Sequence, residues 1–263
     1  MLHKVNTFLA IEFILVVALL PILASIRCVN ADSEVTILSY DSYIDTVGFF
    51  HVVGEVQNTG TVALRYVEII ATFYNSSGVV VATDFTFADL STVHVGEKSP
   101  FDILFTDETQ IPKIDHYSLI TDYSTGTPLT PALRMLSNSS YTDTSGFMHI
   151  VGEIQNDGVS RATFVEVLAT LYDSGGNVVL TDFTFTDPSD IDPGEKAPFD
   201  ILVTVEDRIP LVDSYSLSAQ SNQYSLVPEL SANVLIILIV VSLSVGTLFL
   251  RKKLLKIQNY RLT

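Results

Sequence analysis

The sequence predicts an all-β protein built from two tandem antiparallel β-sandwiches. Three observations lead to this prediction. One long unit is written twice, its apolar residues alternate in short segments separated by turns, and long apolar runs occur only near the two ends of the chain. We expect an N-terminal signal helix and a C-terminal transmembrane helix to flank the repeats. The predicted segments of the 263-residue chain are a signal peptide (1–31), repeat 1 (32–122), a linker (123–132), repeat 2 (133–220), a stalk (221–231), a transmembrane helix (232–250) and a basic cytoplasmic tail (251–263).

The N-terminal segment is typical of a secretory signal peptide. Lys4 supplies a positive start, an apolar run follows, Pro21 interrupts that run, and small residues at 29–31 offer a cleavage site. An uncleaved signal anchor is the alternative, because residues 8–26 are almost enough to span a bilayer. We favour cleavage because the apolar run is interrupted.

Residues 232–250 are typical of a transmembrane helix. They contain no charged residue and are rich in Leu, Ile and Val, and a helix of this length covers about 28 Å of a ~30 Å hydrocarbon core. A helix buried in a globular domain is disfavoured because no face of the segment is polar. Arg251, Lys252 and Lys253 follow directly. The positive-inside rule therefore predicts a cytoplasmic C-terminus and extracellular repeats on a single-pass cell-membrane protein.

The charges are unevenly distributed along the chain. Residues 31–231 hold 7 basic and 29 acidic residues, a net charge of 7 − 29 = −22. Such a surface repels phosphate backbones, so we do not expect nucleic acid as a partner. The only cysteine is Cys28. The repeats therefore cannot contain a disulfide, and their hydrophobic cores must stabilise them.

The duplication can be read directly from the residues. The run Gly48-Phe-Phe-His-Val-Val-Gly-Glu-Val-Gln-Asn-Thr-Gly60 returns as Gly146-Phe-Met-His-Ile-Val-Gly-Glu-Ile-Gln-Asn-Asp-Gly158, a shift of 146 − 48 = 98 residues. The shift holds without a gap over 48–119, where 41 of 72 positions are identical. A period near 100 residues is too long for a solenoid and fits two independent tandem domains.

Each repeat is expected to consist of short strands. Turns that contain glycine at 58–60, 76–78 and 95–97 separate these strands, and glycine can adopt the positive φ that many turns require. Six or seven strands with turns every 8–12 residues are typical of an immunoglobulin-like sandwich. The strands expected in repeat 1 are 35–39, 49–57, 63–74, 79–87, 101–105 and 117–121.

One face of the 63–74 strand is expected to lie in the core. Apolar residues alternate there with more polar ones, as a half-buried antiparallel strand requires. The same pattern returns in repeat 2. The expected core residues are Val67, Ile69, Ala71, Phe73, Val165, Val167, Ala169 and Leu171.

Several of these segments resemble a known family. Residues 169–173 read Ala-Thr-Leu-Tyr-Asp, with Val-Gly-Glu-Ile-Gln-Asn at 151–156 upstream and Pro-Gly-Glu at 193–195 downstream. Together they resemble the FxLYD domain of prokaryotic, and we expect archaeal, cell-surface proteins. Both repeats depart from the name motif, because Ala71 and Ala169 stand where the family has Phe. The resemblance implies an immunoglobulin-like sandwich at a cell surface and no established activity.

His51 and His149 occupy matching positions, each four residues before a glutamate, Glu55 or Glu153. Residues i and i+4 of a strand share a face, so each pair could offer ligands to a metal ion. Two ligands about 13 Å apart along one strand cannot share an ion unless another strand contributes. We interpret both pairs as part of an exposed polar strand face.

An acidic segment of repeat 2 is a weak candidate for a metal site. Asp187, Asp190, Asp192 and Glu195 place four carboxylates in nine residues. They suggest calcium, although their spacing is not that of an EF-hand loop. Asx and Pro-Gly turns account for the same residues without a metal, and we prefer that interpretation. No cofactor is expected.

Two further sites are candidates for modification. Asn75 and Asn138 each begin an Asn-Ser-Ser sequon, and both are expected at turns or domain starts outside the cell. They are therefore possible N-glycosylation sites.

The sequence carries no motif that points to catalysis. It has no Gly-rich phosphate loop, no Gly-x-Ser-x-Gly elbow and no His-Glu-x-x-His. The leading hypothesis is therefore a membrane-anchored surface protein with a structural, adhesive or protein- or glycan-binding role and no enzymatic activity. The alternative is an extracellular recognition subunit that binds a small ligand or Ca²⁺ and acts through a membrane partner. Because the linker is rich in Thr and Pro, we expect the two domains to project as a rod.

Overall fold

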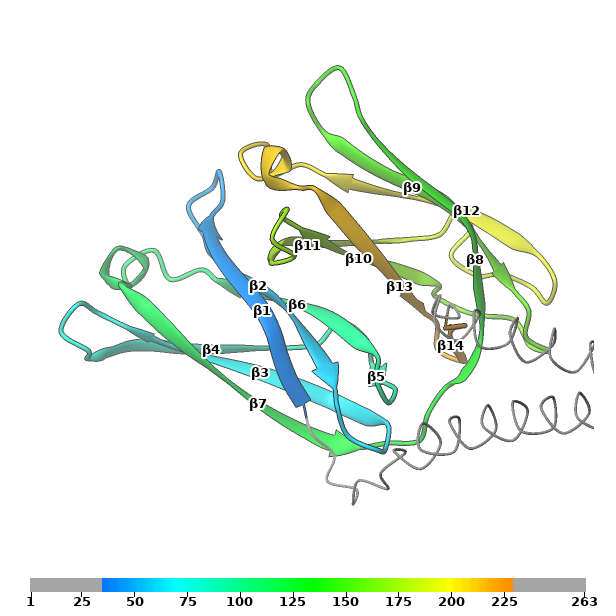
Figure 1. The fold of residues 1–263 in the computed structure, drawn as a ribbon, viewed down its shortest axis with the longest axis horizontal. Helices are drawn as coiled ribbons and strands as arrows, with labels where there is room; N and C mark the ends of the chain where they lie inside the picture. The colour runs from blue at the N-terminus through cyan, green and yellow to red at the C-terminus, as the bar shows by residue number, and fades with distance from the viewer. Residues whose placement is uncertain (1–34, 229–263) are drawn as a thin grey trace, which may run out of the picture.

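The computed structural model describes residues 35–228 (Figure 1). The predicted signal peptide, transmembrane helix and cytoplasmic tail lie outside these residues. The described part is all β, as predicted, with two short 3₁₀ turns; none of its helices could cross a membrane. Its elements are β1 (Val35–Ile44), β2 (Phe50–Asn58), β3 (Leu64–Tyr74), β4 (Val80–Phe87), β5 (Thr92–Val93), β6 (Lys98–Phe105), η1 (Ile111–Lys113), β7 (His116–Thr125), β8 (Thr130–Thr142), β9 (Met148–Asn156), β10 (Glu166–Tyr172), β11 (Val178–Phe185), β12 (Lys196–Val203), η2 (Ile209–Leu211), β13 (Ser214–Gln220) and β14 (Tyr224–Leu226).

Repeat 1 consists of two antiparallel sheets. Strands β1, β2 and β6 form one sheet, and β4, β3 and β7 form the other, with β5 paired to the start of β3. Phe73 from one sheet and Phe101 from the other are both fully buried in the core between them. Burial of two large aromatic rings is a main source of stability in a small domain without disulfides.

Repeat 2 has the same arrangement with one addition. Strands β8, β9 and β12 face β11, β10 and β13, and β14 runs parallel to β8 and antiparallel to β13. The sequence assigns residues 221–231 to a stalk, but β14 belongs to repeat 2. The reason is that Tyr224 is 7% exposed and lies in the core of this repeat.

The predicted core face is confirmed in both repeats. All eight residues expected there are 2% exposed or less. The predicted linker is shorter than expected, because β7 continues to Thr125 and β8 begins at Thr130. Only residues 126–129 therefore connect the two repeats. The side chain of Arg65 occupies the place that a Cβ at Gly126 would need, so glycine lets the connector pass closely over β3.

Buried asparagines close the turn after β2 and its counterpart after β9. Asn58 Nδ2 donates hydrogen bonds to the carbonyl oxygens of Val62 (2.8 Å) and Val93 (2.9 Å), and its Oδ1 accepts one from the N–H of Gly60. Asn156 makes the same three contacts in repeat 2. A side-chain amide here satisfies backbone groups that would otherwise be buried without a partner.

An aromatic residue at the start of β3, and its counterpart just before β10, have a left-handed backbone conformation. Tyr66 has φ 51° and its counterpart Phe164 has φ 53°. This conformation costs an ordinary L-residue roughly 1–2 kcal/mol. Both side chains nevertheless remain more than 60% exposed.

The two repeats pack side by side through sheet faces (Figure 1). The extended rod expected from the linker composition is therefore wrong. The short connector turns the chain back, so that β10 and β11 of repeat 2 lie against β1, β2 and β6 of repeat 1.

Candidate functional site at the interface between the repeats

The interface joins two sheet faces that are not equivalent. Repeat 2 contributes the outward face of β11, β10 and β13, and repeat 1 contributes the outward face of β1, β2 and β6. Leu168 of β10 is 1% exposed and packs into the hydrophobic cluster of repeat 1. Val53 of β2 and Val178 of β11 are completely buried. The centre of the interface is therefore apolar.

A buried carboxylate is satisfied from both repeats. Glu55 is 2% exposed. Its Oε1 accepts a 2.6 Å hydrogen bond from the hydroxyl of Tyr172, and its Oε2 accepts a 2.8 Å bond from Lys98 Nζ. Burial, together with this hydrogen bond, raises the pKa of Tyr172 to about 12, so the hydroxyl stays protonated and donates. A buried charge with fewer partners would be costly.

A second polar contact lies at the other end of the interface. Gln220 Nε2 donates to the carbonyl oxygen of Asp89 at 2.7 Å and to Glu166 Oε2 at 2.8 Å. Its Oε1 accepts from the N–H of Ser91 at 2.8 Å. One side chain thus binds two backbone groups of repeat 1 and a carboxylate of repeat 2.

A third contact surrounds the start of β11. The N–H of Val178 donates to Ser39 Oγ at 3.0 Å. Arg208 donates from Nη2 to Asp41 Oδ2, and its guanidinium lies 5.3 Å from the ring centre of Tyr43. This is an ion pair between the repeats, with the arginine side chain largely buried.

Three acidic side chains near the interface have raised pKa values. Burial, reinforced by the charges of Glu166 and Asp102, raises the pKa of Asp89 to about 8. Burial near Asp102 also raises the pKa of Asp182 to about 6. The pKa of Glu166 is raised by burial as well. Burial thus favours the protonated form of each of these three carboxyl groups.

His51 contacts two aspartates and not Glu55. Its Nδ1 lies 2.8 Å from Asp102 Oδ2, its Nε2 lies 3.4 Å from Asp45 Oδ2, and its ring stacks on Tyr43 with centroids 4.7 Å apart. Burial opposes protonation, but the hydrogen bonds and charges of the two aspartates outweigh it and raise the histidine pKa. His51 is partly buried and Glu55 is 2% exposed, so the interpretation of this pair as an exposed strand face is wrong in repeat 1.

His149 has the same surroundings in repeat 2. Its Nδ1 lies 3.0 Å from Asp200 Oδ1, its Nε2 lies 3.6 Å from Asp143 Oδ2, and its ring stacks on Tyr141 at 4.7 Å. The hydrogen bond to Asp200 raises the pKa of this histidine. Glu153 instead pairs with Lys196 at 2.8 Å. The histidines thus fasten neighbouring strands of each repeat.

An arginine meets the acidic segment of repeat 2. Arg161 lies 3.3 Å from Asp190 Oδ2 and 3.6 Å from Asp192 Oδ1. Asp190 Oδ1 also accepts from the N–H of Phe164. Within the described residues, neither Asp187 nor Glu195 forms an ion pair with Arg161. Across residues 35–228, no three His, Cys, Asp or Glu side chains are grouped so as to hold a metal ion.

The two sequon asparagines differ in surroundings. Asn75 closes the turn between β3 and β4, where its Oδ1 accepts from the N–H groups of Ser77 and Val79. Asn138 lies within β8, and its Oδ1 accepts a 3.0 Å hydrogen bond from the hydroxyl of Tyr215. In both residues these hydrogen bonds are accepted by Oδ1, whereas a glycan would be attached to Nδ2.

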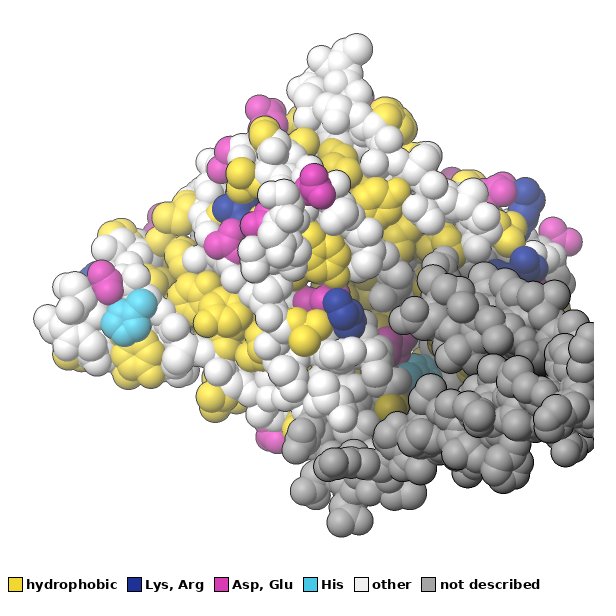
Figure 2. All heavy atoms as spheres, in the orientation of Figure 1, with side chains coloured by type: hydrophobic (Ala, Val, Ile, Leu, Met, Phe, Trp, Pro, Cys, Tyr) yellow, Lys and Arg dark blue, Asp and Glu magenta, His cyan; other side chains and the backbone are white. Residues whose placement is uncertain are grey.

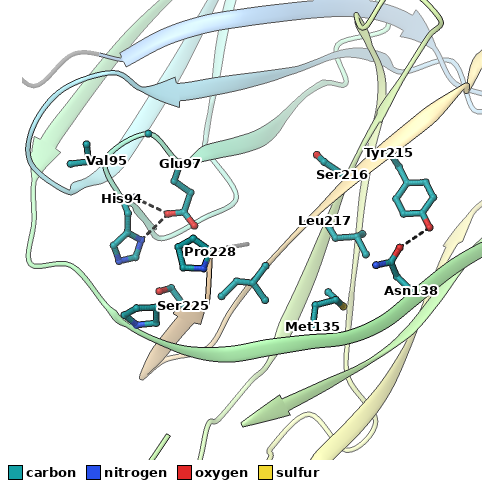
Figure 3. A pocket seen from close by; sticks show the side chains of 13 residues that line it. His94, Val95, Glu97, Met135, Asn138, Tyr215, Ser216, Leu217, Ser225 and Pro228 are labelled. Atoms are coloured by element: carbon teal, nitrogen blue, oxygen red, sulfur yellow. Dashed lines mark hydrogen bonds and ion pairs between the residues drawn. The ribbon is translucent and has the colours of Figure 1, made fainter. Parts of the chain in front are cut away.

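A cavity of about 1060 Å³ opens beside the interface (Figure 3). The 94–97 turn of repeat 1 lines one side, where His94 Nδ1 lies 2.7 Å from Glu97 Oε2. The other sides come from β8, β13 and β14 of repeat 2, with Met135, Leu217 and Leu226 among the apolar residues. The cavity thus has mixed walls, because Asn138, Ser216 and Ser225 of repeat 2 line it beside these apolar residues.

Each repeat also exposes a cluster of aromatic rings. In repeat 1, Phe85 and Phe87 are 54% and 47% exposed, their centroids lie 6.0 Å apart, and Tyr66 contacts Phe87 at 6.4 Å. Phe183 and Phe185 have nearly the same exposure in repeat 2, at 53% and 46%. Figure 2 shows hydrophobic side chains gathered over repeat 1, with Asp and Glu among them.

Sequence reasoning missed the interface entirely, although a signal was present. Tyr172, Glu55 and Lys98 lie at outward positions of their strands, where sequence alone gives no reason for identity between repeats. Each is nevertheless identical to its counterpart 98 residues away. Identity at outward polar positions could have pointed to a contact surface.

The described part of the chain is thus an all-β protein of two sandwich repeats that dock through unlike faces. A protein of Methanocaldococcus jannaschii, described as uncharacterized protein MJ0360, is 31% identical over 102 residues, which cover 37% of this chain and 74% of that protein. The chain belongs to the same family as this archaeal protein. No protein-family model matches the chain.

Several solved structures show a distant likeness. They include an exo-chitosanase of Amycolatopsis orientalis (TM-score 0.25, 13% identity, 73% of this chain and 26% of that one) and red sea bream transglutaminase (TM-score 0.25, 9% identity, 78% and 32%). A β-glucuronidase of Bacteroides uniformis has a TM-score of 0.26 and 11% identity over 70% and 27%. The chain spans a third or less of each protein. These TM-scores are too low to assign an activity.

Proposed function

We propose that this chain is a single-pass cell-surface protein with two immunoglobulin-like, FxLYD-type domains. Its role is structural, adhesive or protein- or glycan-binding, without catalysis. The apolar segment 232–250 and the cations that follow it support the membrane anchor, and the N-terminal segment supports export. The strongly acidic repeats then face the outside of the cell.

The exposed aromatic clusters carry the proposed binding role. Half-exposed Phe rings occur at the same two positions in each repeat, outside the area covered by the other repeat. Tyr66 extends the cluster of repeat 1 in spite of an unfavourable backbone conformation, which its counterpart Phe164 shares. Exposed aromatic groups of this kind mark surfaces that stack on sugar rings or bury against protein.

Protease accessibility tests the topology. Protease added to intact cells should digest the repeats, and inverted vesicles should protect them. The opposite pattern would remove the surface role.

Co-sedimentation tests the binding role. Liposomes that carry the full chain should bind cell-envelope fragments, and Phe85→Ser combined with Phe183→Ser should weaken this binding severalfold. Val159→Ser is a matched control, because Val159 is 94% exposed and belongs to neither pair of Phe rings. Equal binding by all three proteins would exclude the aromatic clusters as the binding surface.

The cavity beside the interface favours a second candidate, an extracellular recognition subunit for a small ligand or Ca²⁺. Its apolar residues, together with polar groups such as the His94–Glu97 pair and Asn138, suit a small molecule that has both apolar and polar parts. For calcium, calorimetric titration of the full chain is the test. Heat uptake that disappears in Asp190→Ala with Asp192→Ala would promote this candidate over the first.

A further inference from the structure

The docking of the two repeats uses only half of the faces that the duplication provides. We call the outward face of β11, β10 and β13 the donor face of repeat 2. The outward face of β1, β2 and β6 is the acceptor face of repeat 1. By the 98-residue shift, repeat 1 has its own donor face on β4, β3 and β7, and repeat 2 has its own acceptor face on β8, β9 and β12. Within residues 35–228 neither of these two faces is covered, and they lie at opposite sides of the molecule (Figure 1).

The free donor face keeps the residues that the engaged one buries. Val178 is completely buried, whereas its counterpart Val80 is 53% exposed. Leu168 is 1% exposed, whereas Ile70 is partly exposed. Tyr74, the counterpart of Tyr172, makes a hydrogen bond to Ser118 and none to a carboxylate.

The free acceptor face keeps the matching partners. Glu153 and Lys196 form the same 2.8 Å ion pair as Glu55 and Lys98. The Glu153 side chain is 39% exposed, against 3% for Glu55. Ser137, the counterpart of Ser39, follows the same irregularity in strand pairing. The carboxylate that would accept from Tyr74 is therefore already in place.

Where the free faces differ from the docked faces, both partners of a contact are replaced together. Arg208 and Asp41 form an ion pair between the repeats, and their counterparts are Gln110 and Ser139. Neither counterpart is charged, so Gln110 and Ser139 could form a hydrogen bond in place of the ion pair. A lone change at one position would have left a largely buried charge without its partner.

We propose that a second copy of this chain docks its donor face of repeat 1 onto the free acceptor face of repeat 2. This inference rests on the proposed surface location and names the partner. The contact joins unlike faces, so it runs head to tail and builds rows or rings of molecules on the membrane. This contact between chains is expected to be weaker than the internal contact at the position that corresponds to Gln220. There Asp122 replaces Gln220 and would approach the counterpart of Asp89, which is Asp187.

Cysteine cross-linking in native membranes tests the proposal with the full chain. The hydrogen bond between Val178 and Ser39 brings these residues close enough for a disulfide. In a Cys28→Ser background, Ser39→Cys with Val178→Cys should therefore close within one chain. Val80→Cys with Ser137→Cys reproduces the same geometry at the free faces, where closure requires a second chain.

The expected result is a ladder of dimers, trimers and larger species from Val80→Cys with Ser137→Cys under mild oxidation. Chains that carry only one of the two cysteines, mixed together, should stop at dimers. Adding Asp122→Gln should increase the yield, and adding Tyr74→Ala should reduce it severalfold. The proposal is overturned if the Ser39–Val178 control closes while the free faces give no product between chains. Protease accessibility and envelope binding are measured separately, so that outcome would leave the proposed function intact.

Discussion

The hydroxyl of Tyr172 in repeat 2 donates a 2.6 Å hydrogen bond to Oε1 of Glu55 in repeat 1. The two residues are 117 positions apart in the chain. The identical tyrosine of repeat 1, Tyr74, lacks this partner and keeps the contact to Ser118 that Tyr172 makes to Ser216. The same side chain thus binds the other repeat in repeat 2, whereas in repeat 1 it has no carboxylate partner among the described residues.

Tyr172→Phe should destabilise the folded protein by about 1–3 kcal/mol, because it leaves one oxygen of the buried Glu55 without a donor. Tyr74→Phe removes the same atom from an exposed position, so its effect should stay within about 0.5 kcal/mol. Urea unfolding of dilute protein measures both. Equal losses in the two variants would show that the hydroxyl does not contribute through the interface.

Stability should fall as the pH rises from about 4 to about 8. Asp89 and Asp182 have folded pKa values of about 8 and about 6, above those of the unfolded chain. The folded state therefore binds more protons in this window and is stabilised by acid. His51 and His149 act in the same direction, because their raised pKa values favour the charged form below neutral pH.

Asp89→Asn tests this dependence. The amide cannot ionise, so the variant should melt at a higher temperature than the wild type at pH 8. Its melting temperature should also change less between pH 5 and pH 8. Thermal unfolding followed by circular dichroism gives both numbers, and parallel curves for the two proteins would contradict the assignment.

The turn asparagines should be nearly independent of each other. Asn58→Ala and Asn156→Ala each remove three hydrogen bonds from a buried turn. Each should cost about 1–3 kcal/mol. Because the two turns share no contact, the double variant should lose about the sum of the single losses. A much larger loss in the double variant would mean that the repeats unfold as one unit through these turns.

The left-handed tyrosine offers a backbone test. Tyr66→Gly and Tyr66→Ala both remove the ring, but only glycine adopts φ 51° without strain. The glycine variant should therefore be more stable than the alanine variant by about 1 kcal/mol. Both variants should bind cell-envelope fragments less well than the wild type. Chemical denaturation separates the stability effect from the binding effect.

Much of the fold could be predicted because it follows local rules. The alternation of Val67, Ile69, Ala71 and Phe73 identified the buried face of β3, and all four are buried. The duplication then transferred every inference from one repeat to the other. The location of β14 could not be predicted, because three residues provide no periodicity and their pairing with β8 depends on distant contacts.

The interface could not be predicted, because strand periodicity describes which side of a strand faces its own core. It does not show that Val53, on the other side of β2, is also buried.

Paired changes between the repeats are a more informative signal of which residues contact each other. The N–H of Leu90 donates to Ser99 Oγ at 2.9 Å. Its counterpart Pro188 has no N–H, and Ser99 is matched by Ala197.

The brevity of the connector governs how the repeats find each other. Residues 126–129 reach about 14 Å when fully stretched. A repeat 2 that had come loose would stay tethered beside its docking face, at an effective concentration in the millimolar range or above. Modest complementarity is then enough to keep the pair closed. A single proteolytic cut in the connector would convert this closure into an encounter between separate bodies, and dilution would pull them apart.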